Sequence, residues 1–311
     1  MRAEKQPDMK SLLIEINEFS PTGSVEPQVP MSLHTSFRTG GRAEALVTAE
    51  NESHLAQTLA VLHREQIPHL VLGSGSNVLI KDGGYRGVVI KLGSRFQEIE
   101  TEGTQLTAGS ATKISAAAKA AMEEGLSGLE FASGIPGSIG GGIFMNAGAY
   151  GSEVKEILVS ATAMAKDGSR TYQLSGSDLE LGYRRSAFQK SGDIILRGSF
   201  QLQPADKADI FARMKELLDR RNAKQPVQLP SAGSFFKRPE GYYAGKLIED
   251  AGLKGLSVGG AQVSPLHAGF IVNNGEATTA DILQLMRLIQ NTVYDQFGVH
   301  LEPEVRILGE D

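Results

Sequence analysis

Three short segments of this 311-residue chain carry side chains that could do chemistry. In the first, Ser234 follows Gly233 and precedes two phenylalanines, with Lys237 and Arg238 just beyond. Its hydroxyl could therefore meet an anionic ligand in a dry pocket. The segment lacks the Gly-x-Ser-x-Gly pattern of a nucleophile elbow, and no nearby histidine is evident as a base. A turn serine in front of a Phe-Phe core anchor would fit the same pattern.

The other two segments are charged. Arg184 and Arg185 stand in a stretch that we expect to be extended, where neighbouring side chains point to opposite faces, so only one is expected to enter a pocket. Glu302 and Glu304 are two positions apart and could share one face of a strand that runs through Pro303. The alternation of acidic and basic residues in this run would equally suit a surface ladder on an edge strand.

The most unusual stretch runs from Phe131 to Ser152, with seven glycines and no charged side chain. Its Pro-Gly pair and Gly triplet argue against a stable helix, including one that spans a membrane. Its isoleucines would not sit in water, which argues against a linker. We therefore expect buried, irregular backbone that aims its amides at a large ligand. A tightly packed glycine-rich turn in a β-rich core is the alternative.

A second glycine-rich loop covers residues 73–77, Gly-Ser-Gly-Ser-Asn, and is followed at once by Val78-Leu79-Ile80. A Rossmann fingerprint would open a helix here, and a P-loop would carry Gly-Lys-Ser/Thr, so the loop is neither. Between two strands, such a loop can offer amides and hydroxyls to a diphosphate. A plain hairpin loop would look the same in the sequence.

Composition narrows the class of protein. The length favours about two domains, and a net charge of -5 gives no basic footprint for nucleic acid. The chain has no cysteine, which excludes disulfides and fits a reducing cytosol, and its N-terminus has no apolar run long enough for export. The six histidines are scattered and do not suggest a metal site. We expect a cytoplasmic protein without a bound metal, nucleic acid, membrane segment or obligate protein partner.

Hydrophobic periodicity and turn residues predict mixed helices and strands, with no internal repeat. Residues 1–30 are expected to be a loose start around one short helix, and residues 96–109 to form short paired strands. Helices are expected over residues 11–19, 53–65, 115–124, 208–223, 245–251 and 280–297. Strands are expected over residues 45–49, 69–72, 78–80, 87–92, 157–164, 171–174, 194–202, 269–273 and 301–309.

Single residues are expected to end or begin these elements. Asn51 and Thr279 are predicted to cap helices at their N-termini, Gly125 to end a helix, and Asp167-Gly168 to form a hairpin turn. Pro204 is the expected domain boundary. The helix after it is expected to turn Ile210, Met214, Leu217 and Leu218 inward.

Seven segments in a fixed order resemble the UDP-N-acetylenolpyruvoylglucosamine reductase family. They span residues 35–306, and the combination of the seven segments is specific to this family. The segments are TSFRTGG (35–41), GSGSNVLI (73–80), GIPGSIGGGIFMNAGAYG (134–151), YRRSAF (183–188), AGSFFKRP (232–239), KGLSVGGAQVS (254–264) and LEPEVR (301–306).

The resemblance implies an α+β fold with an FAD-binding domain of the vanillyl-alcohol-oxidase (PCMH) type over residues 1–204, divided into subdomains of about 1–92 and 93–204. A substrate-binding α+β domain would follow over residues 205–311, and its last strand, about 299–311, could pack back on the first subdomain. The implied reaction uses non-covalently bound FAD. NADPH supplies a hydride, which reduces the enolpyruvyl ether of UDP-N-acetylglucosamine to UDP-N-acetylmuramate for peptidoglycan synthesis.

The resemblance also assigns roles residue by residue. Ser234 would donate a proton, while Arg184 and Glu304 would stabilise the intermediate. The substrate would contact Tyr183, Lys224, Arg238, Tyr242, Lys254 and His267. The FAD would contact Gly73, Ser74, Gly75, Ser76, Asn77, Ser133, Gly134, Ile135, Pro136, Gly137, Gly140, Gly141, Asn146, Ala147, Gly148 and Arg306.

This sequence departs from those family members that carry a long loop with a tyrosine lid. Only residues 189–193 separate Phe188 from the next predicted strand, so the chain resembles the short-loop form. The sequence does not identify the segment that closes its site. Two other functions compete with the reductase. One is an FAD oxidase of the same fold that acts on an alcohol or sugar, and the other is a flavin- or UDP-sugar-binding module without catalysis.

Overall fold

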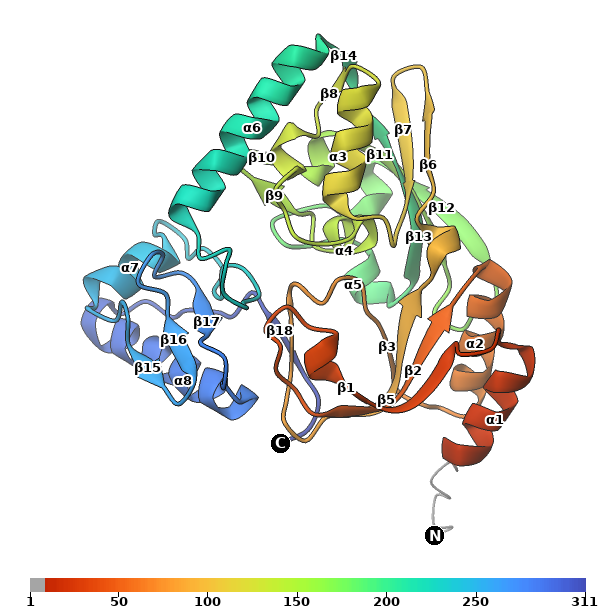
Figure 1. Ribbon diagram of the computed structural model, residues 1–311, viewed down its shortest axis with the longest axis horizontal. Coiled ribbons are helices and arrows are strands. Elements are labelled where there is room, and N and C mark those ends of the chain that lie inside the picture. Colours follow the sequence, from red (N-terminus) through yellow and green to blue (C-terminus); the bar gives the residue numbers. More distant parts are fainter. Residues whose placement is uncertain (1–8) are drawn as a thin grey trace. The chain divides into compact units, whose positions relative to one another are not determined.

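A computed structural model describes residues 9–311, so the first eight residues of the predicted loose start lie outside the description. The chain forms two compact units, coloured by sequence in Figure 1. Unit 1 holds residues 9–29, 44–73 and 87–218, and unit 2 holds residues 30–43, 74–86 and 219–311. The predicted boundary at Pro204 precedes helix α6, whereas the passage between the units falls inside that helix, after Leu218.

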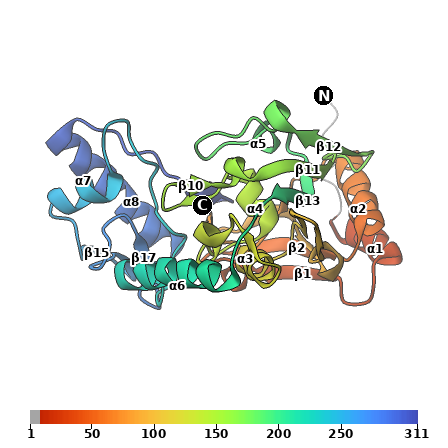
Figure 2. The same cartoon turned by 90° about the horizontal axis from the view of Figure 1, so that it is seen from above.

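The first layer of unit 1 packs two helices on a four-stranded sheet. Helices α1 (Met9–Phe19) and α2 (Glu52–Arg64) lie side by side, as Figures 1 and 2 both show. Leu12 and Leu55 from these helices share one core cluster with Val88 and Ile90 from the sheet. The strands, in sheet order, are β1 (Val25–Pro30), β2 (Arg42–Ala49), β5 (Tyr85–Leu92) and β3 (His69–Val71).

The second layer of unit 1 is an antiparallel sheet covered by helix α3 (Ile114–Glu123). Ala117, Ala118 and Ala121 of the helix are buried in the same cluster as Leu106 and Phe200 of the sheet. Asp167-Gly168 lies in the turn between β11 and β12, as predicted, and Gly168 has a φ of 75°. The strands, in sheet order, are β12 (Thr171–Ser175), β11 (Leu158–Met164), β13 (Ile194–Gln201), β7 (Gln105–Gly109) and β6 (Ile99–Glu102).

The prediction that the glycine-rich stretch contains no helix is wrong for helix α4 (Ile139–Phe144). Ser138 caps it, because its Oγ accepts a hydrogen bond from the Gly141 amide at 3.4 Å. Ile139 and Ile143 bury the inner side of the helix in the core. Burial of this face offsets the entropic cost of three consecutive glycines, which propensity alone does not capture. Among residues 9–311, no helix is long and apolar enough to cross a membrane.

Unit 2 is built around helix α8 (Thr279–Phe297). Its predicted stripe of Ile282, Leu285, Ile289 and Val293 is buried, and it packs with helix α7 (Ala244–Asp250). The antiparallel strands β15 (Ser257–Val258), β16 (Ala261–Val263) and β17 (Ile271–Asn273) cover it. Strand β4 (Val78–Ile80) pairs in parallel with the last strand, β18 (Arg306–Leu308).

The N-cap of α8 is Thr278, one residue before the predicted Thr279. The Thr278 Oγ1 accepts from the Asp281 amide at 3.1 Å, and the Asp281 carboxylate accepts from the Thr278 amide at 3.0 Å. Thr279 instead begins the helix and donates from its hydroxyl to the Ile80 carbonyl at 2.7 Å. The Asp82 carboxylate accepts from the Thr279 and Ala280 amides at 2.9 and 2.8 Å, so a distant loop completes the cap.

Helix α6 (Lys207–Lys224) is more exposed than predicted. Ile210 and Leu217 are buried and Met214 packs against the unit 1 core, but Leu218 is 43% exposed. Leu218 lies one step around the helix from Leu217, outside the narrow stripe that the core covers.

Shorter elements are β8 (Leu126–Ser127), β9 (Gly148–Ala149), β10 (Ser152–Glu153), β14 (Gln203–Pro204), α5 (Phe188–Ser191) and the 3₁₀ turns at Met31–Leu33, Ser94–Phe96, Glu130–Ala132, Val154–Glu156 and Gly176–Leu179.

A buried histidine joins the first two helices. Asn51 caps α2 as predicted, accepting from the His54 amide at 2.9 Å, and the His54 ring is buried. Its Nδ1 accepts from the Glu50 amide at 3.3 Å and its Nε2 lies 2.8 Å from the Ser20 hydroxyl, which donates to the Ile16 carbonyl at 2.6 Å. The ring is therefore neutral, and burial lowers its pKa below the usual 6.5.

This contact predicts an acid-sensitive fold. Below the usual histidine pKa of 6.5, the unfolded chain binds a proton at His54 that the folded chain does not. The free energy of unfolding should therefore decrease as the pH is lowered below that value. In urea titrations at pH 7, His54→Gln should lower the unfolding midpoint, corresponding to a loss of about 1 kcal/mol in the free energy of unfolding. Between pH 7 and pH 5, this variant should lose less stability than the unaltered chain. His63→Gln, on the exposed side of α2, is the matched control.

Burial also lowers the pKa of His69 and His267, so part of the acid sensitivity should remain in the His54 variant. An equal loss of stability between pH 7 and pH 5 in His54→Gln and the unaltered chain would contradict this assignment.

Candidate active site

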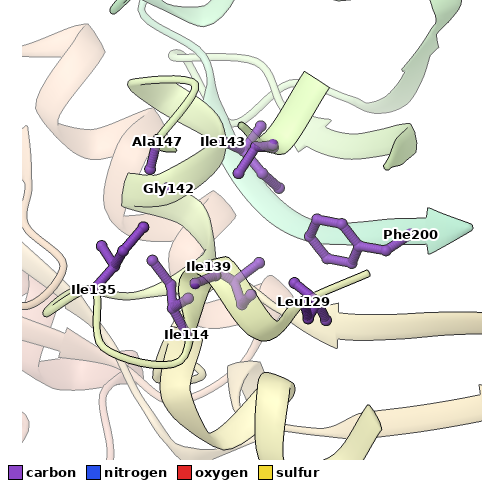
Figure 3. A pocket seen from close by; sticks show the side chains of 10 residues that line it. Ile114, Leu129, Ile135, Ile139, Gly142, Ile143, Ala147 and Phe200 are labelled. Atoms are coloured by element: carbon purple, nitrogen blue, oxygen red, sulfur yellow. The ribbon is translucent and has the colours of Figure 1, made fainter. Parts of the chain in front are cut away.

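The glycine-rich stretch has an apolar inner face. Ile135, Ile139, Ile143 and Ala147 turn their side chains into a pocket within unit 1, which Figure 3 shows from close by. The pocket has an empty volume of about 280 Å³, part of it open space, and no charged residue lines it. The other lining residues are Ile114, Leu129, Ala132, Gly142, Val154 and Phe200. The inner face thus anchors the segment 133–148, which we call the cradle.

The outer face of the cradle is backbone. Gly134, Gly137 and Gly141 are all at least partly exposed. Within residues 9–311, the amides of Gly134 and Gly137 have no protein acceptor. A Cβ added at Gly141 would meet only the Ser138 Oγ, at 3.5 Å, so the space beyond it is open. Gly134 and Gly137 can therefore present amides to a ligand, and Gly141, whose amide donates to Ser138 Oγ, leaves space for a ligand that lies flat on the backbone.

Other predicted cradle residues are held by the protein. The Gly140 amide donates to the Ser110 carbonyl at 2.9 Å, and Gly148 pairs with Glu153. The Ser133 hydroxyl donates to the Glu130 carbonyl at 2.8 Å. Ile135 and Ala147 face the pocket, and Pro136 is exposed. Their contribution to ligand binding can therefore come from backbone and shape rather than from free polar side chains.

The loop at residues 73–77 is tightly built. A Cβ at Gly73 would lie 2.4 Å from the Ser138 Oγ, so within unit 1 the loop begins against the cradle. Gly75, in unit 2, has a φ of 65°, and a Cβ there would lie 2.1 Å from the His34 carbonyl oxygen. No protein acceptor among the described residues takes the Ser74 or Gly75 amide. Two neighbouring amides of this kind suit an anionic group.

The end of this loop is joined to the last strand within unit 2. The Arg306 amide donates to the Asn77 carbonyl at 3.0 Å, and Asn77 Nδ2 donates to the Glu304 carbonyl at 3.3 Å. Parallel pairing sets Arg306 opposite Val78. The chain therefore places the backbone of Arg306, an exposed residue, next to a loop that offers amides, and a guanidinium and free amides both favour a diphosphate.

Ser234 and Glu304 lie in paired segments of unit 2. The Glu304 amide donates to the Phe235 carbonyl at 2.8 Å, and Phe236 stands opposite Pro303. That position exchanges no hydrogen bonds in an antiparallel pair, so the proline loses nothing there. The Ser234 side chain is exposed and Glu304 is half-buried.

Glu302 has a different place from Glu304. Its carboxylate lies 3.0 Å from the Lys237 ammonium, and its side chain is 72% exposed. The surface-ladder alternative therefore describes Glu302. Glu304 lies beside the serine segment. An exposed pair of this kind contributes little to stability.

His267 lies on the other side of the serine segment. Ser234 pairs with Phe270, and the Phe235 amide donates to the Gly269 carbonyl at 2.9 Å. The Gly269 amide in turn donates to His267 Nδ1 at 3.1 Å. Burial lowers the pKa of His267 and the Lys254 ammonium lowers it further, so the ring is neutral and carries its proton on Nε2.

The remaining predicted substrate residues of unit 2 supply cations and tyrosines. The Arg238 guanidinium lies 4.0 Å from the ring centroid of Tyr243, and its Nε donates to the Tyr242 carbonyl at 3.3 Å. Tyr242 is exposed, as is Lys224 at the end of α6. The Lys254 ammonium lies 3.0 Å from the Glu249 carboxylate.

Arg184 stands in a tight turn of unit 1, so the prediction that its segment is extended is wrong. Gly182 and Arg185 exchange amide-to-carbonyl hydrogen bonds of 3.1 and 3.0 Å, which leaves Tyr183 and Arg184 at the tip. Arg184 has a φ of 53°, a conformation that costs a non-glycine residue about 1–2 kcal/mol. Its guanidinium carbon lies 5.3 Å from the ring centroid of Tyr183. Such strain is common at functional sites.

Asn146 and Gln189 join this turn to the cradle. Asn146 Nδ2 donates to the Gly182 carbonyl at 3.0 Å, and Gln189 Nε2 donates to the Arg184 carbonyl at 2.9 Å. The resemblance to the family implies a cofactor contact for Asn146 and no role for Gln189. The only sequence signal for Gln189 is its position five residues beyond Arg184.

The comparisons with known proteins agree over nearly the whole chain. Residues 225–308 match the family described as UDP-N-acetylenolpyruvoylglucosamine reductase, C-terminal domain, and residues 43–171 match the FAD binding domain family. The reductase of Clostridioides difficile (strain 630) is 50% identical over 282 residues, 91% of this chain and 92% of that protein. That of Clostridium perfringens (strain SM101 / Type A) is 46% identical over 296 residues, 95% and 97% of the two chains.

Solved structures agree. The crystal structure of UDP-N-acetylenolpyruvylglucosamine reductase from Thermus caldophilus has a TM-score of 0.80 and 36% identity, and covers 91% of this chain and 98% of its own. Phl p 4.0202, a glucose dehydrogenase, matches with a TM-score of 0.50 at 12% identity over 93% of this chain and 63% of its own, which shows the fold alone. The chain therefore has the α+β fold with a PCMH-type FAD-binding domain, and it belongs to the UDP-N-acetylenolpyruvoylglucosamine reductase family.

Proposed function

We propose that Ser234, Glu304 and Arg184 carry the chemistry of the family reaction in this chain. The chain is an FAD-dependent oxidoreductase that uses NADPH to reduce the enolpyruvyl ether of UDP-N-acetylglucosamine to UDP-N-acetylmuramate, a precursor of peptidoglycan. The observation that carries the assignment of roles is the pairing in unit 2 of the Ser234 segment with Glu304, through the 2.8 Å bond from the Glu304 amide to the Phe235 carbonyl.

The residues fit FAD. The Ser74 and Gly75 amides need an acceptor, and diphosphate oxygens are suitable partners. Arg306, beside Asn77, can neutralise part of the diphosphate charge. The outer face of the cradle, at Gly134, Gly137 and Gly141, has no side chain to hold a planar ring away from the backbone. We propose that these groups and the other predicted cofactor residues hold the FAD, with Asn146 contributing through its backbone because its side chain is bonded to the protein.

The reaction creates negative charge that the side chains must stabilise. When bound, FAD supplies the hydride that adds to the methylene carbon of the enolpyruvyl group. Addition next to a carboxylate builds an enediolate-like dianion, and a cation together with a hydrogen-bonding acid lowers its energy. We assign the cation to Arg184 and the acid to Glu304.

Ser234 would donate the proton that completes the reduction. A hydroxyl is ordinarily too weak an acid, but the carbon next to the carboxylate is basic enough in the dianion to accept its proton. The C–H bond forms as the Ser234 O–H bond breaks, and the serine oxygen is reprotonated from solvent. The Gly233 neighbour, with a φ of 75° and no atom within 4 Å of an added Cβ, leaves room for the substrate.

For the UDP part of the substrate we propose Tyr183, Lys224, Arg238, Tyr242, Lys254 and His267. The lysines and Arg238 can offset the charge of the diphosphate in a chain of net charge -5. The neutral His267 ring can donate from Nε2. Both charge and hydrogen bonding support these residues.

We also propose that residues 1–204 form the FAD-binding domain, with subdomains of about 1–92 and 93–204, and residues 205–311 the substrate-binding domain. Location in the cytoplasm, and the lack of a nucleic acid or obligate protein partner, are part of the same proposal. The matched ranges 43–171 and 225–308 support the division.

A visible absorption spectrum under anaerobic conditions tests the function. The flavin bands should bleach with NADPH and return on adding the enolpyruvyl ether of UDP-N-acetylglucosamine. Bands that return with air alone and ignore this substrate would indicate an oxidase instead. A colourless protein that takes up no FAD would contradict the assignment of the cradle.

Ser234→Ala should separate the two halves of the reaction. Bleaching by NADPH should be near normal, while recovery with the enolpyruvyl substrate should slow by about 10²-fold or more, because protonation belongs only to the second half. Anaerobic stopped-flow absorbance measures both rates. Ser231→Ala, in the same loop, is the control, and an equal loss in both halves would argue against Ser234 as the acid.

Arg184→Lys should also slow the second half of the reaction. A lysine keeps the charge but replaces the planar guanidinium fork, which matches a carboxylate with two hydrogen bonds, by a point charge. Recovery should therefore slow by about tenfold or more. The matched control is Arg185→Lys at the exposed neighbour. Near-normal recovery in Arg184→Lys would show that charge alone is sufficient.

Gly141→Ala should affect fold and cofactor in opposite directions. Alanine should stabilise α4 in the apoprotein by up to about 1 kcal/mol because it favours a helix more than glycine does. A methyl group on the outer face should nevertheless weaken FAD binding by about tenfold or more, or about 1.4 kcal/mol.

Thermal unfolding of the apoprotein and quenching of FAD fluorescence on binding measure the two effects. Gly142→Ala, which faces Ile114 in the apolar pocket, is the control and should leave FAD affinity unchanged. Unaltered FAD binding by Gly141→Ala would show that the flavin does not lie against this face.

A further inference from the structure

Asn146 is buried, with 0% relative exposure, and its side chain is saturated by the protein. Nδ2 donates to the Glu153 carboxylate at 2.9 Å and to the Gly182 carbonyl at 3.0 Å. Oδ1 accepts from the Lys155 amide at 2.9 Å. Both amide hydrogens are therefore used within unit 1, and this side chain has no donor left for a cofactor.

The Gly182 bond reaches the base of the Arg184 turn. Gly182 and Arg185 close this turn with two mutual hydrogen bonds, and Arg184 at its tip adopts a φ of 53°. An arginine does not favour this conformation, so the turn needs support from its surroundings. Asn146 itself has a φ of 43°, a conformation that asparagine tolerates better than most residues.

A second link reaches the tip of the turn. Gln189 Nε2 donates to the Arg184 carbonyl at 2.9 Å and to the Phe144 carbonyl at 2.8 Å. The Ser186 hydroxyl donates to the same Phe144 carbonyl at 2.8 Å. Phe144, the last residue of α4, therefore bonds to residues that follow Arg184, while Asn146, two residues beyond the helix, bonds to Gly182 before it.

From these contacts we infer that Asn146 and Gln189 are positioning residues, which hold the Arg184 turn in register with the end of the cradle. They act on the reaction through the backbone around Arg184 and do not touch the reacting atoms. The inference rests on the proposed role of Arg184. It assigns two separate segments, 144–146 and 182–189, to one hydrogen-bonded assembly within unit 1.

Asn146→Asp gives the sharpest test because the shape of the side chain stays the same. An aspartate has no donor for the Gly182 carbonyl, and it sets a second carboxylate against Glu153. The charged groups around position 146 are Glu153, the Lys155 ammonium paired with it, and Glu156 close to Lys155. Protonation of the new carboxylate pair at lower pH should restore one donor.

Hydrogen exchange of the apoprotein reports the turn without any cofactor. In Asn146→Asp at pH 8, the Gly182 and Arg185 amides should exchange about tenfold faster or more, with the strands of the β11–β13 sheet unchanged. Glu153→Gln, which keeps the Asn146 bond to Gly182, should leave the turn protected. Unaltered exchange at Gly182 and Arg185 in Asn146→Asp would overturn the inference.

Kinetics of the FAD-loaded enzyme give the second readout. Asn146→Asp should slow flavin recovery with the enolpyruvyl substrate by about tenfold or more at pH 8, keep bleaching by NADPH near normal, and regain part of the rate as pH falls. Asn146→Asp with Glu153→Gln removes the repulsion but does not restore the Gly182 bond, so recovery should stay slow at pH 8 and should return only at a lower pH than in Asn146→Asp alone. Full recovery at pH 8 in this double variant would contradict positioning through Gly182.

Gln189→Ala tests the second link. It also keeps the inference testable if the variant at the buried Asn146 does not fold. Gln189 is exposed, so its loss should leave the unfolding midpoint nearly unchanged while flavin recovery slows. Lys190→Gln, the next residue of α5, is the matched control. Recovery at the normal rate in Gln189→Ala would overturn its part in the inference.

These outcomes are separable from the proposed function. If the unaltered chain shows no recovery with the enolpyruvyl ether, the reaction assignment fails, while exchange at Gly182 and Arg185 still tests the assembly. If exchange responds in Asn146→Asp but recovery does not, the positioning role is wrong and the reductase assignment stands.

Discussion

The structure depends on burying one side of a segment that has almost no polar side chains. Ile135, Ile139, Ile143 and Ala147 fix the cradle in an apolar pocket, which leaves its other side as bare backbone. Backbone amides that find no partner in a fold are costly, so such a surface is stable only where a ligand or water meets it. The same burial fixes α4, whose last residues anchor the Arg184 turn. One apolar contact surface therefore supports both the proposed cofactor surface and the arginine proposed to be catalytic.

Much of the fold follows from local sequence patterns. The stripe of Ile282, Leu285, Ile289 and Val293 predicts the buried face of α8, and Asn51 predicts the start of α2, because periodicity and capping are local properties. Helix α4 could not be predicted this way. Its glycines oppose a helix locally, and only the distant side chains that bury Ile139 and Ile143 make it stable.

The site residues likewise divide into those that the sequence marks and those whose geometry depends on tertiary packing. Residue types single out the segments of Ser234, of Arg184 and Arg185, and of Glu302 and Glu304, and the resemblance to the family selects Ser234, Arg184 and Glu304 among them. The turn at Arg184 and the exposure of Leu218 depend on tertiary packing, which the sequence does not display. Asn146 shows the limit most clearly, since a family motif marks the residue but not the bonds to Glu153 and Gly182 that use both of its donors.

The pairing of β4 with β18 has a consequence for synthesis on the ribosome. Residues 78–80 are made more than 200 residues before their partners at 306–308, and Asp82 caps a helix that begins only at Thr279. Because β4 pairs with residues 306–308, unit 2 cannot complete its fold before those residues have been made. Until then the nascent protein must keep the apolar segment Val78-Leu79-Ile80 from pairing elsewhere.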